Sequence, residues 1–155
     1  MKVILYRINS IILKVLKSAL IILFASLILL MVVNVFLRYV LSKPLFWVTE
    51  ICSYVLLYLI MGGATLALYY GNHISINIDL SKLGAIAKRI IDIISTIAAY
   101  ILIIAFIIYG SILVCENISS YTGTVPISMG LVYLAVPVNA VIMLLLYSEK
   151  VIKRK

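Results

Sequence analysis

The chain has 155 residues, 66% of them hydrophobic and only 12% charged, and its mean hydropathy is +1.28. A soluble domain is about 45–50% apolar and about 25% charged, and one core of this size could not bury so much apolar surface, so the composition excludes a soluble enzyme, a disordered chain and a disulfide scaffold. The net charge of +8, from 13 Lys and Arg against 5 Asp and Glu, leaves nucleic acid or a membrane as the partner, and the positions of the charges decide between them.

Four long stretches carry no charged residue: 18–37, 51–70, 93–115 and 117–148, the last of which begins as a loop. A hydrocarbon layer of about 30 Å needs about 20 helical residues, so each stretch predicts one crossing. We predict an all-α integral membrane protein with a single domain, 1–155, and four transmembrane helices near 17–38, 47–70, 90–114 and 127–148. No cleavage motif follows the first stretch, and its apolar run is longer than that of a usual signal peptide, so we expect a retained helix.

The basic residues gather on one side of these predicted spans. If the N-terminus is cytoplasmic, only Arg38 and Lys43 lie outside, and the other eleven of the 13 basic residues lie inside: Lys2, Arg7, Lys14, Lys17, Lys82, Lys88, Arg89, Lys150, Lys153, Arg154 and Lys155. The positive-inside rule therefore predicts that both termini are cytoplasmic. The partner expected for this charge is anionic phospholipid, and nucleic-acid binding is not expected.

The second predicted helix follows a short outer connection that contains Pro44, which cannot continue a helix. Trp47 then stands where an interfacial anchor belongs. Glu50 follows one turn later, about 5 Å along the helix, and is the one acidic residue that the pattern places within the bilayer. We expect it to pair with Arg38, at similar depth on the first helix, or with a cation on a partner chain.

One side of the second helix carries a row of aromatic, small and polar residues, spaced three or four apart: Trp47, Glu50, Tyr54, Tyr58, Gly62, Thr65 and Tyr69. This spacing keeps the row on one face of an α-helix. Gly62 and Gly63 would let another helix approach closely, and tyrosine hydroxyls can bond across such a contact. The face packs either within the four-helix bundle or against another protein, and the sequence favours neither.

The inner connection, 71–89, alternates apolar and polar residues and then changes to helical spacing. We predict an amphipathic segment in the headgroup layer, with an unstructured cytoplasmic loop as the alternative. His73, the only histidine, stands at the inner end of the second helix, so a haem held by two histidines is not expected and a hydrogen-bonding role at the helix end is favoured.

No spacing of Cys and His is typical of a metal site, and we expect no metal or cofactor. Cys52 and Cys115 are predicted to be buried free thiols, with a disulfide as the alternative. Pro137 lies within the fourth predicted helix and should kink it.

Several motifs occur together and in order: 34–39 (Asn-Val-Phe-Leu-Arg-Tyr), Trp47-x-x-Glu50, 62–64 (Gly-Gly-Ala), 71–74 (Gly-Asn-His-Ile), 125–129 (Val-Pro-Ile-Ser-Met) and 133–137 (Tyr-Leu-Ala-Val-Pro). This ordered set resembles the small membrane subunit of the tripartite ATP-independent periplasmic (TRAP) transporters of bacteria. Two positions depart from the family's pattern: Asn77 stands where an acid is usual, and Asn139 stands where glycine is frequent.

The resemblance implies a multi-pass protein of the bacterial inner membrane that is not an enzyme and has no cofactor. It would pack against and anchor a large permease subunit, which imports a carboxylate solute of the dicarboxylate or sialic acid class with sodium. A periplasmic binding protein would deliver that solute. Arg38, Trp47, Glu50 and His73 match the family's motif, and the resemblance implies structural and interface roles for them. Two alternatives remain: a self-sufficient proton-coupled multidrug exporter that uses Glu50, and the membrane anchor of a redox enzyme.

Overall fold

The structure is a computed structural model that describes residues 2–42, 45–70, 85–121 and 123–154, with side chains from residue 9 to 151 outside the gaps and outside 85–88. The described chain is helical, as predicted, with one isolated antiparallel bridge between Tyr121 and Ser128. Its helices are α1 (Lys2–Val40), α2 (Phe46–Tyr70), α3 (Ala85–Asn117), α4 (Met129–Tyr133) and α5 (Ala135–Arg154). Four stretches are long and apolar enough to cross a membrane: Asn9–Val40, Phe46–Tyr70, Arg89–Asn117 and Met129–Val151.

The helices are longer than the charge-free stretches that predicted them. Helix α1 begins at Lys2, not near residue 17, because residues 2–16 contain no glycine or proline to end it. Its 39 residues span about 58 Å, which exceeds a hydrocarbon layer of about 30 Å, so α1 must tilt or project from the membrane. Helix α3 already includes residues 85–89, which were assigned to the interfacial segment. The rest of that segment, 71–84, lies outside the described residues, and so does His73.

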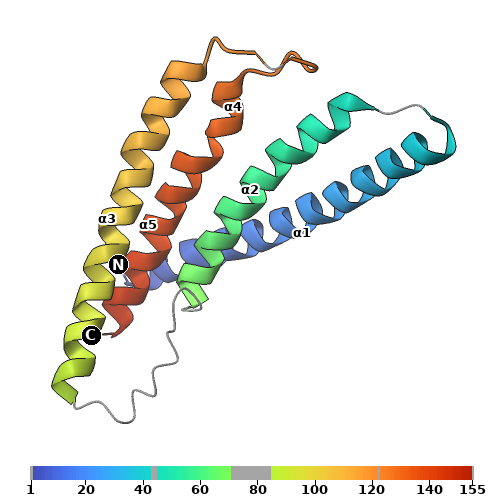
Figure 1. Cartoon of the computed structure of the whole chain (residues 1–155). Coiled ribbons are helices and arrows are strands. Elements are labelled where there is room, and N and C mark those ends of the chain that lie inside the picture. The colour runs from blue at the N-terminus through green and yellow to red at the C-terminus, as the bar shows by residue number, and fades with distance from the viewer. Residues whose placement is uncertain (1, 43–44, 71–84, 122, 155) are drawn as a thin grey trace.

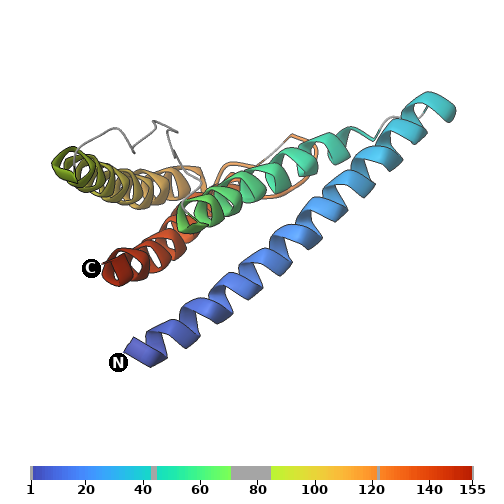
Figure 2. The same cartoon turned by 90° about the horizontal axis from the view of Figure 1, so that it is seen from below.

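The helices form an open row and not a square bundle. Helix α5 packs against α2 on one side and α3 on the other, and α1 packs mainly on α2. Figure 1 shows α3 and α5 side by side, whereas α1 and α2 extend together away from them toward their connecting turn. In the view from below, α1 runs along the outer side of the row, on the side away from α3 (Figure 2). Helix α5 therefore lies at the centre of the molecule.

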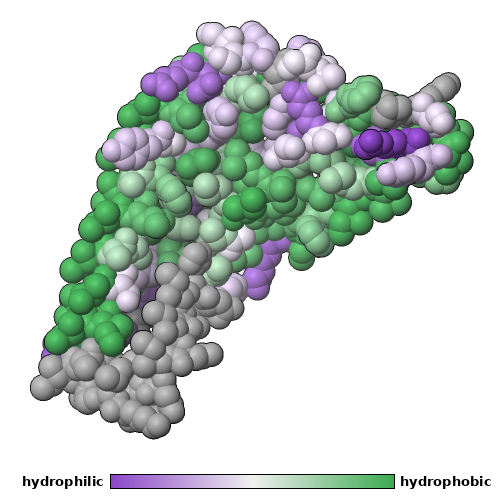
Figure 3. All heavy atoms as spheres, viewed as in Figure 1, coloured by the Kyte–Doolittle hydropathy of each residue, from purple (hydrophilic) through white to green (hydrophobic). Residues whose placement is uncertain are grey.

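Burial follows this order of the helices. Most fully buried apolar side chains of the described part belong to α4, α5 and the residues that join them: Val132, Ala135, Ala140, Met143 and Leu146, with Val48 and Cys52 from α2 and Ile103 from α3 completing the set. In its most apolar 18 residues α1 has no buried residue, whereas 44% of the corresponding stretch of Met129–Val151, which comprises α4 and most of α5, is buried. Apolar residues cover much of the side of the molecule in Figure 3, with hydrophilic residues toward the ends. Such a surface is suited to lipid or to the helices of another membrane protein.

Candidate functional site

At the end of the molecule that the charge pattern predicts to be the outer one, Glu50 ties the connection between α3 and α4 to helix α2. Its carboxylate accepts a hydrogen bond from the Tyr54 hydroxyl, with an O···O distance of 2.6 Å. It also accepts hydrogen bonds from the backbone N–H of Thr124, with an N···O distance of 3.2 Å, and from the Thr124 hydroxyl. One carboxylate thus joins α2 to a loop 74 residues further along the chain. We call Glu50, Tyr54 and Thr124 the outer clasp.

The pairing of Glu50 with Arg38, or with a cation on a partner chain, stays a prediction. The Arg38 guanidinium lies 5.9 Å from the ring centroid of its neighbour Tyr39. The charge pattern did not predict that donors of the loop between α3 and α4 would reach the Glu50 carboxylate.

The turn between α1 and α2 is closed by two local features. Ser42 has a φ of 51°, the left-handed conformation that ends a helix. The Asn34 side-chain oxygen accepts a hydrogen bond from the Leu45 N–H, with an N···O distance of 3.3 Å. Trp47 stands in the first turn of α2 with 41% of its surface exposed, in the position expected of an interfacial residue.

The predicted face of α2 makes its contacts within the chain. The Tyr58 hydroxyl donates a hydrogen bond to the Leu131 carbonyl of α4, with an O···O distance of 2.7 Å. The buried Thr65 hydroxyl donates to the Met61 carbonyl at 2.9 Å and lies 3.5 Å from the Asn139 carbonyl of α5. Below them, the Lys150 ammonium donates to the Leu68 carbonyl at 3.0 Å, satisfying one of the last carbonyls of α2. The row of residues therefore holds α2 to α4 and α5.

The two glycines of α2 have different surroundings. A Cβ atom at Gly62 would lie 2.6 Å from a methyl group of Leu20, so this glycine permits the close approach of α1. A Cβ atom at Gly63 would meet nothing within 4 Å, and Gly63 is exposed. Only Gly62 thus serves a helix contact within the chain.

The fourth span is interrupted near Pro137. Proline has no N–H to bond the carbonyl four residues earlier, which belongs to Tyr133, and Leu134 separates α4 from α5 while keeping a right-handed helical backbone, with φ −55° and ψ −23°. The kink at Pro137 stays a prediction. Gly110 of α3 faces this interruption: a Cβ atom there would lie 2.9 Å from a Val136 methyl group and 3.2 Å from the Pro137 nitrogen. Gly110 therefore lets α3 and α5 pack closely.

Asn139, one of the departures from the family's pattern, lies in the first turns of α5. Its buried side-chain N–H₂ donates to the Ala135 carbonyl, with an N···O distance of 2.8 Å. This bond gives the buried amide a partner within its own helix. The periodicity of the sequence does not identify Thr124 or Asn139. Thr124 acts through a contact with Glu50, 74 residues away, and Asn139 acts beside the interruption of its helix.

Cys52 and Cys115 are free thiols, as predicted, but only Cys52 is buried and Cys115 is exposed. In the described part of the chain, no group of three or more His, Cys, Asp or Glu side chains could hold a metal ion. Some described polar side chains, such as those of Tyr58, Thr65 and Lys150, join α2 to α4 or α5. More of them bond the backbone of their own helix, as Ser53, Thr96 and Ser111 do.

A family model decides the identity of the chain. The model of the tripartite ATP-independent periplasmic transporters, DctQ component, matches residues 27–154. The chain belongs to the DctQ family. This match covers most of the sequence and confirms the resemblance found in its motifs. No curated protein matches the chain.

Membership of the DctQ family makes this chain the small membrane subunit of a TRAP transporter, and the family is a transporter component. The family works with a large permease subunit and a periplasmic binding protein. The match begins at residue 27, inside α1, so residues 2–26 of that helix lie outside the region shared with the family model.

Proposed function

We propose that this DctQ-family chain packs against and anchors the large permease subunit of its TRAP transporter. The large subunit would import a carboxylate solute, of the dicarboxylate or sialic acid class, together with sodium. The periplasmic binding protein would deliver the solute from the outer side. In this proposal, the small subunit supplies a rigid surface in the inner membrane and does not itself bind the solute.

The observation that carries the proposal is the open row of helices. Helix α5 is central, while α1 and α3 lie at the two edges and keep wide apolar faces exposed. A flat array offers a second membrane protein a broad surface, whereas a closed bundle would offer only a narrow one. The internal bonds of the α2 face keep this array rigid, as a scaffold requires.

A part of α2 is suited to that contact. Its outward side carries Thr49, Ser53 and Gly63, all exposed, between larger apolar side chains. Small residues on an exposed side of a membrane helix allow another helix to approach closely. We propose that a helix of the large subunit packs near Gly63, where a Cβ atom would meet nothing within 4 Å in this chain.

The same proposal gives the chain an orientation. The excess of Lys and Arg at one end places both termini in the cytoplasm, and the outer clasp then faces the periplasm. The inner connection would lie in the cytoplasmic headgroup layer, and His73 would form hydrogen bonds at the end of the second helix.

Co-purification tests the association. The tagged chain is expressed with the large membrane subunit encoded beside it, and the detergent-solubilised complex is purified through the tag. We expect the two proteins to elute together in a fixed ratio from a size-exclusion column. Elution of the folded chain alone would contradict the proposal.

A further inference from the structure

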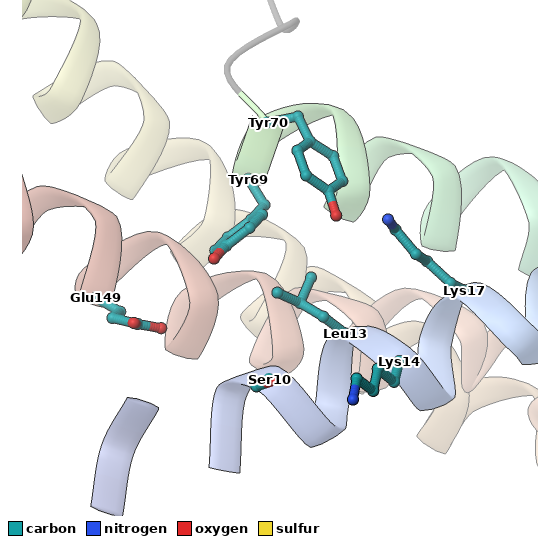
Figure 4. A pocket seen from close by; sticks show the side chains of 7 residues that line it. All are labelled: Ser10, Leu13, Lys14, Lys17, Tyr69, Tyr70 and Glu149. Atoms are coloured by element: carbon teal, nitrogen blue, oxygen red, sulfur yellow. The ribbon is translucent and has the colours of Figure 1, made fainter. Parts of the chain in front are cut away.

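A polar pocket lies at the inner end of the molecule, between α1, α2 and α5. Its cavity of about 200 Å³ is lined by Ser10, Leu13, Lys14, Lys17, Tyr69, Tyr70 and Glu149. Figure 4 shows the two lysines on α1, the two tyrosines at the end of α2 and the carboxylate on α5. No family motif and no contact of the outer clasp involves this pocket, and both lysines precede the matched region.

The cationic groups of the pocket are not neutralised within the described part of the chain. The Lys17 ammonium lies 4.8 Å from the ring centroid of Tyr70, and neither Lys14 nor Lys17 forms an ion pair with a described residue. Residues three apart on a helix have Cβ atoms about 5–6 Å apart. In Figure 4 the Lys17 ammonium points toward Tyr70 and the Lys14 ammonium points to the other side, so rotation of these long exposed side chains would bring both to one anion.

Hydroxyl groups add hydrogen-bonding capacity. The hydroxyls of Ser10, Tyr69 and Tyr70 line the cavity and have no hydrogen bond to the residues that the structure describes. On the opposite wall, the Glu149 carboxylate accepts a hydrogen bond from the Asn9 side chain, with an N···O distance of 2.5 Å. The pocket thus holds two positive charges and one negative charge.

The depth of the pocket points to a lipid. Lys17 directly precedes the charge-free stretch 18–37, Tyr70 ends 51–70, and Glu149 directly follows 117–148, so the pocket lies at the level of the headgroups. The lysine face of α1 continues into exposed apolar side chains at the spacing of one helix face: Ile21, 69% exposed, Phe24, 56%, and Ile28, 45%. An acyl chain can lie along this row.

We propose that the pocket binds the phosphodiester headgroup of an anionic phospholipid. The single negative charge of such a headgroup matches the net positive charge of the two lysines and Glu149. Lys14 and Lys17 bind the phosphate oxygens, the hydroxyl groups donate further hydrogen bonds, and the acyl chains lie on the apolar face of α1. Basic pockets between membrane helices recognise such headgroups. The inference rests on the placement of the chain in a membrane and not on its role in transport.

Native mass spectrometry of the full chain in detergent tests the site. The chain is titrated with dioleoyl phosphatidylglycerol, with dioleoyl phosphatidylcholine and with inorganic phosphate. We expect one phosphatidylglycerol to bind at least about 10-fold more tightly than phosphatidylcholine, because the charge-assisted bonds to the lysines are not offset by a headgroup cation. Inorganic phosphate should not displace the lipid at millimolar concentration, because it lacks the acyl chains.

Variants distinguish lipid binding at the pocket from attraction to the overall positive charge of the chain. The double variant Lys14→Gln/Lys17→Gln should lose the preference for phosphatidylglycerol, whereas Arg89→Gln, which removes an exposed charge on α3, should keep it. Glu149→Gln should bind phosphatidylglycerol more tightly, because it removes the negative charge from the pocket. Thermal unfolding followed by circular dichroism confirms that each variant is folded. Equal binding of the two lipids, displacement by phosphate, or an unchanged preference in the folded double variant would overturn the proposal.

Discussion

Glu50 shows what a single residue contributes and how far its role can be predicted. Its position near the start of a span indicated a structural carboxylate, and the structure gives it structural bonds. The sequence could not supply the partner, because Thr124 lies 74 residues away in an irregular loop with no periodicity. Residue depth can be predicted from the charge pattern, but loop conformation cannot.

Replacing Glu50 by Ala should loosen the outer loop. The Thr124 N–H and the Tyr54 hydroxyl would lose their acceptor, and we expect a loss of about 1–3 kcal/mol in the free energy of unfolding, with a smaller loss for Glu50→Gln. Hydrogen exchange at the Thr124 amide should become faster in Glu50→Ala. Glu116→Ala, at an exposed carboxylate, is the control and should stay within about 0.5 kcal/mol of the parent. Unchanged exchange at Thr124 in the folded Glu50→Ala variant would show that the clasp does not hold the loop.

The packing of two helices depends on the positions at which their backbones come close together. The interruption of the fourth span could be predicted, since the missing N–H of Pro137 is a local property. The close approach at Gly110 could not be predicted, because it acts only through the packing of α3 on α5. For the same reason, the sequence favours neither an internal nor an external role for the α2 face, because periodicity identifies a helix face but not the element that packs against it.

Gly110→Val should destabilise the chain by about 1–3 kcal/mol, because the new side chain would press on the backbone at Pro137. Gly123→Val is the matched control, since a Cβ atom at Gly123 meets nothing within 4 Å. Thermal unfolding in detergent measures both variants. Equal midpoints would mean that α3 and α5 do not meet as described.

The neighbouring glycines of α2 give a second matched pair. Gly62→Leu should lower the unfolding midpoint of the isolated chain, because it presses on Leu20 of α1. Gly63→Leu should leave that midpoint nearly unchanged but weaken co-purification with the large subunit, if a partner helix packs there. A Gly63→Leu chain that keeps full co-purification would place the partner on another surface.

At the scale of the whole molecule, the composition and the charge pattern predict most of the architecture. Four spans follow from apolar length alone, and the structure has four such helices. The open order of those helices could not be predicted, because it depends on which faces pack and not on how apolar each helix is. The charge pattern does not predict the extension of α1 to Lys2, because Lys14 and Lys17 mark the start of the charge-free stretch and not of the helix.

The charge distribution predicts which end faces the periplasm. A membrane-impermeant maleimide added to intact spheroplasts should label Cys115, which is exposed near the outer end of α3. In a Cys115→Ser background, a Lys153→Cys variant should be labelled only after the membrane is opened. Labelling of position 153 in intact spheroplasts would reverse the proposed orientation.

The central claim is that this chain supports a transporter without moving the solute itself. Uptake of a labelled carboxylate solute into liposomes, under an inward sodium gradient, tests it most directly. We expect no uptake above empty liposomes with this chain alone, and uptake when the large permease subunit and the periplasmic binding protein are also present. Solute uptake by this chain reconstituted alone would contradict the account.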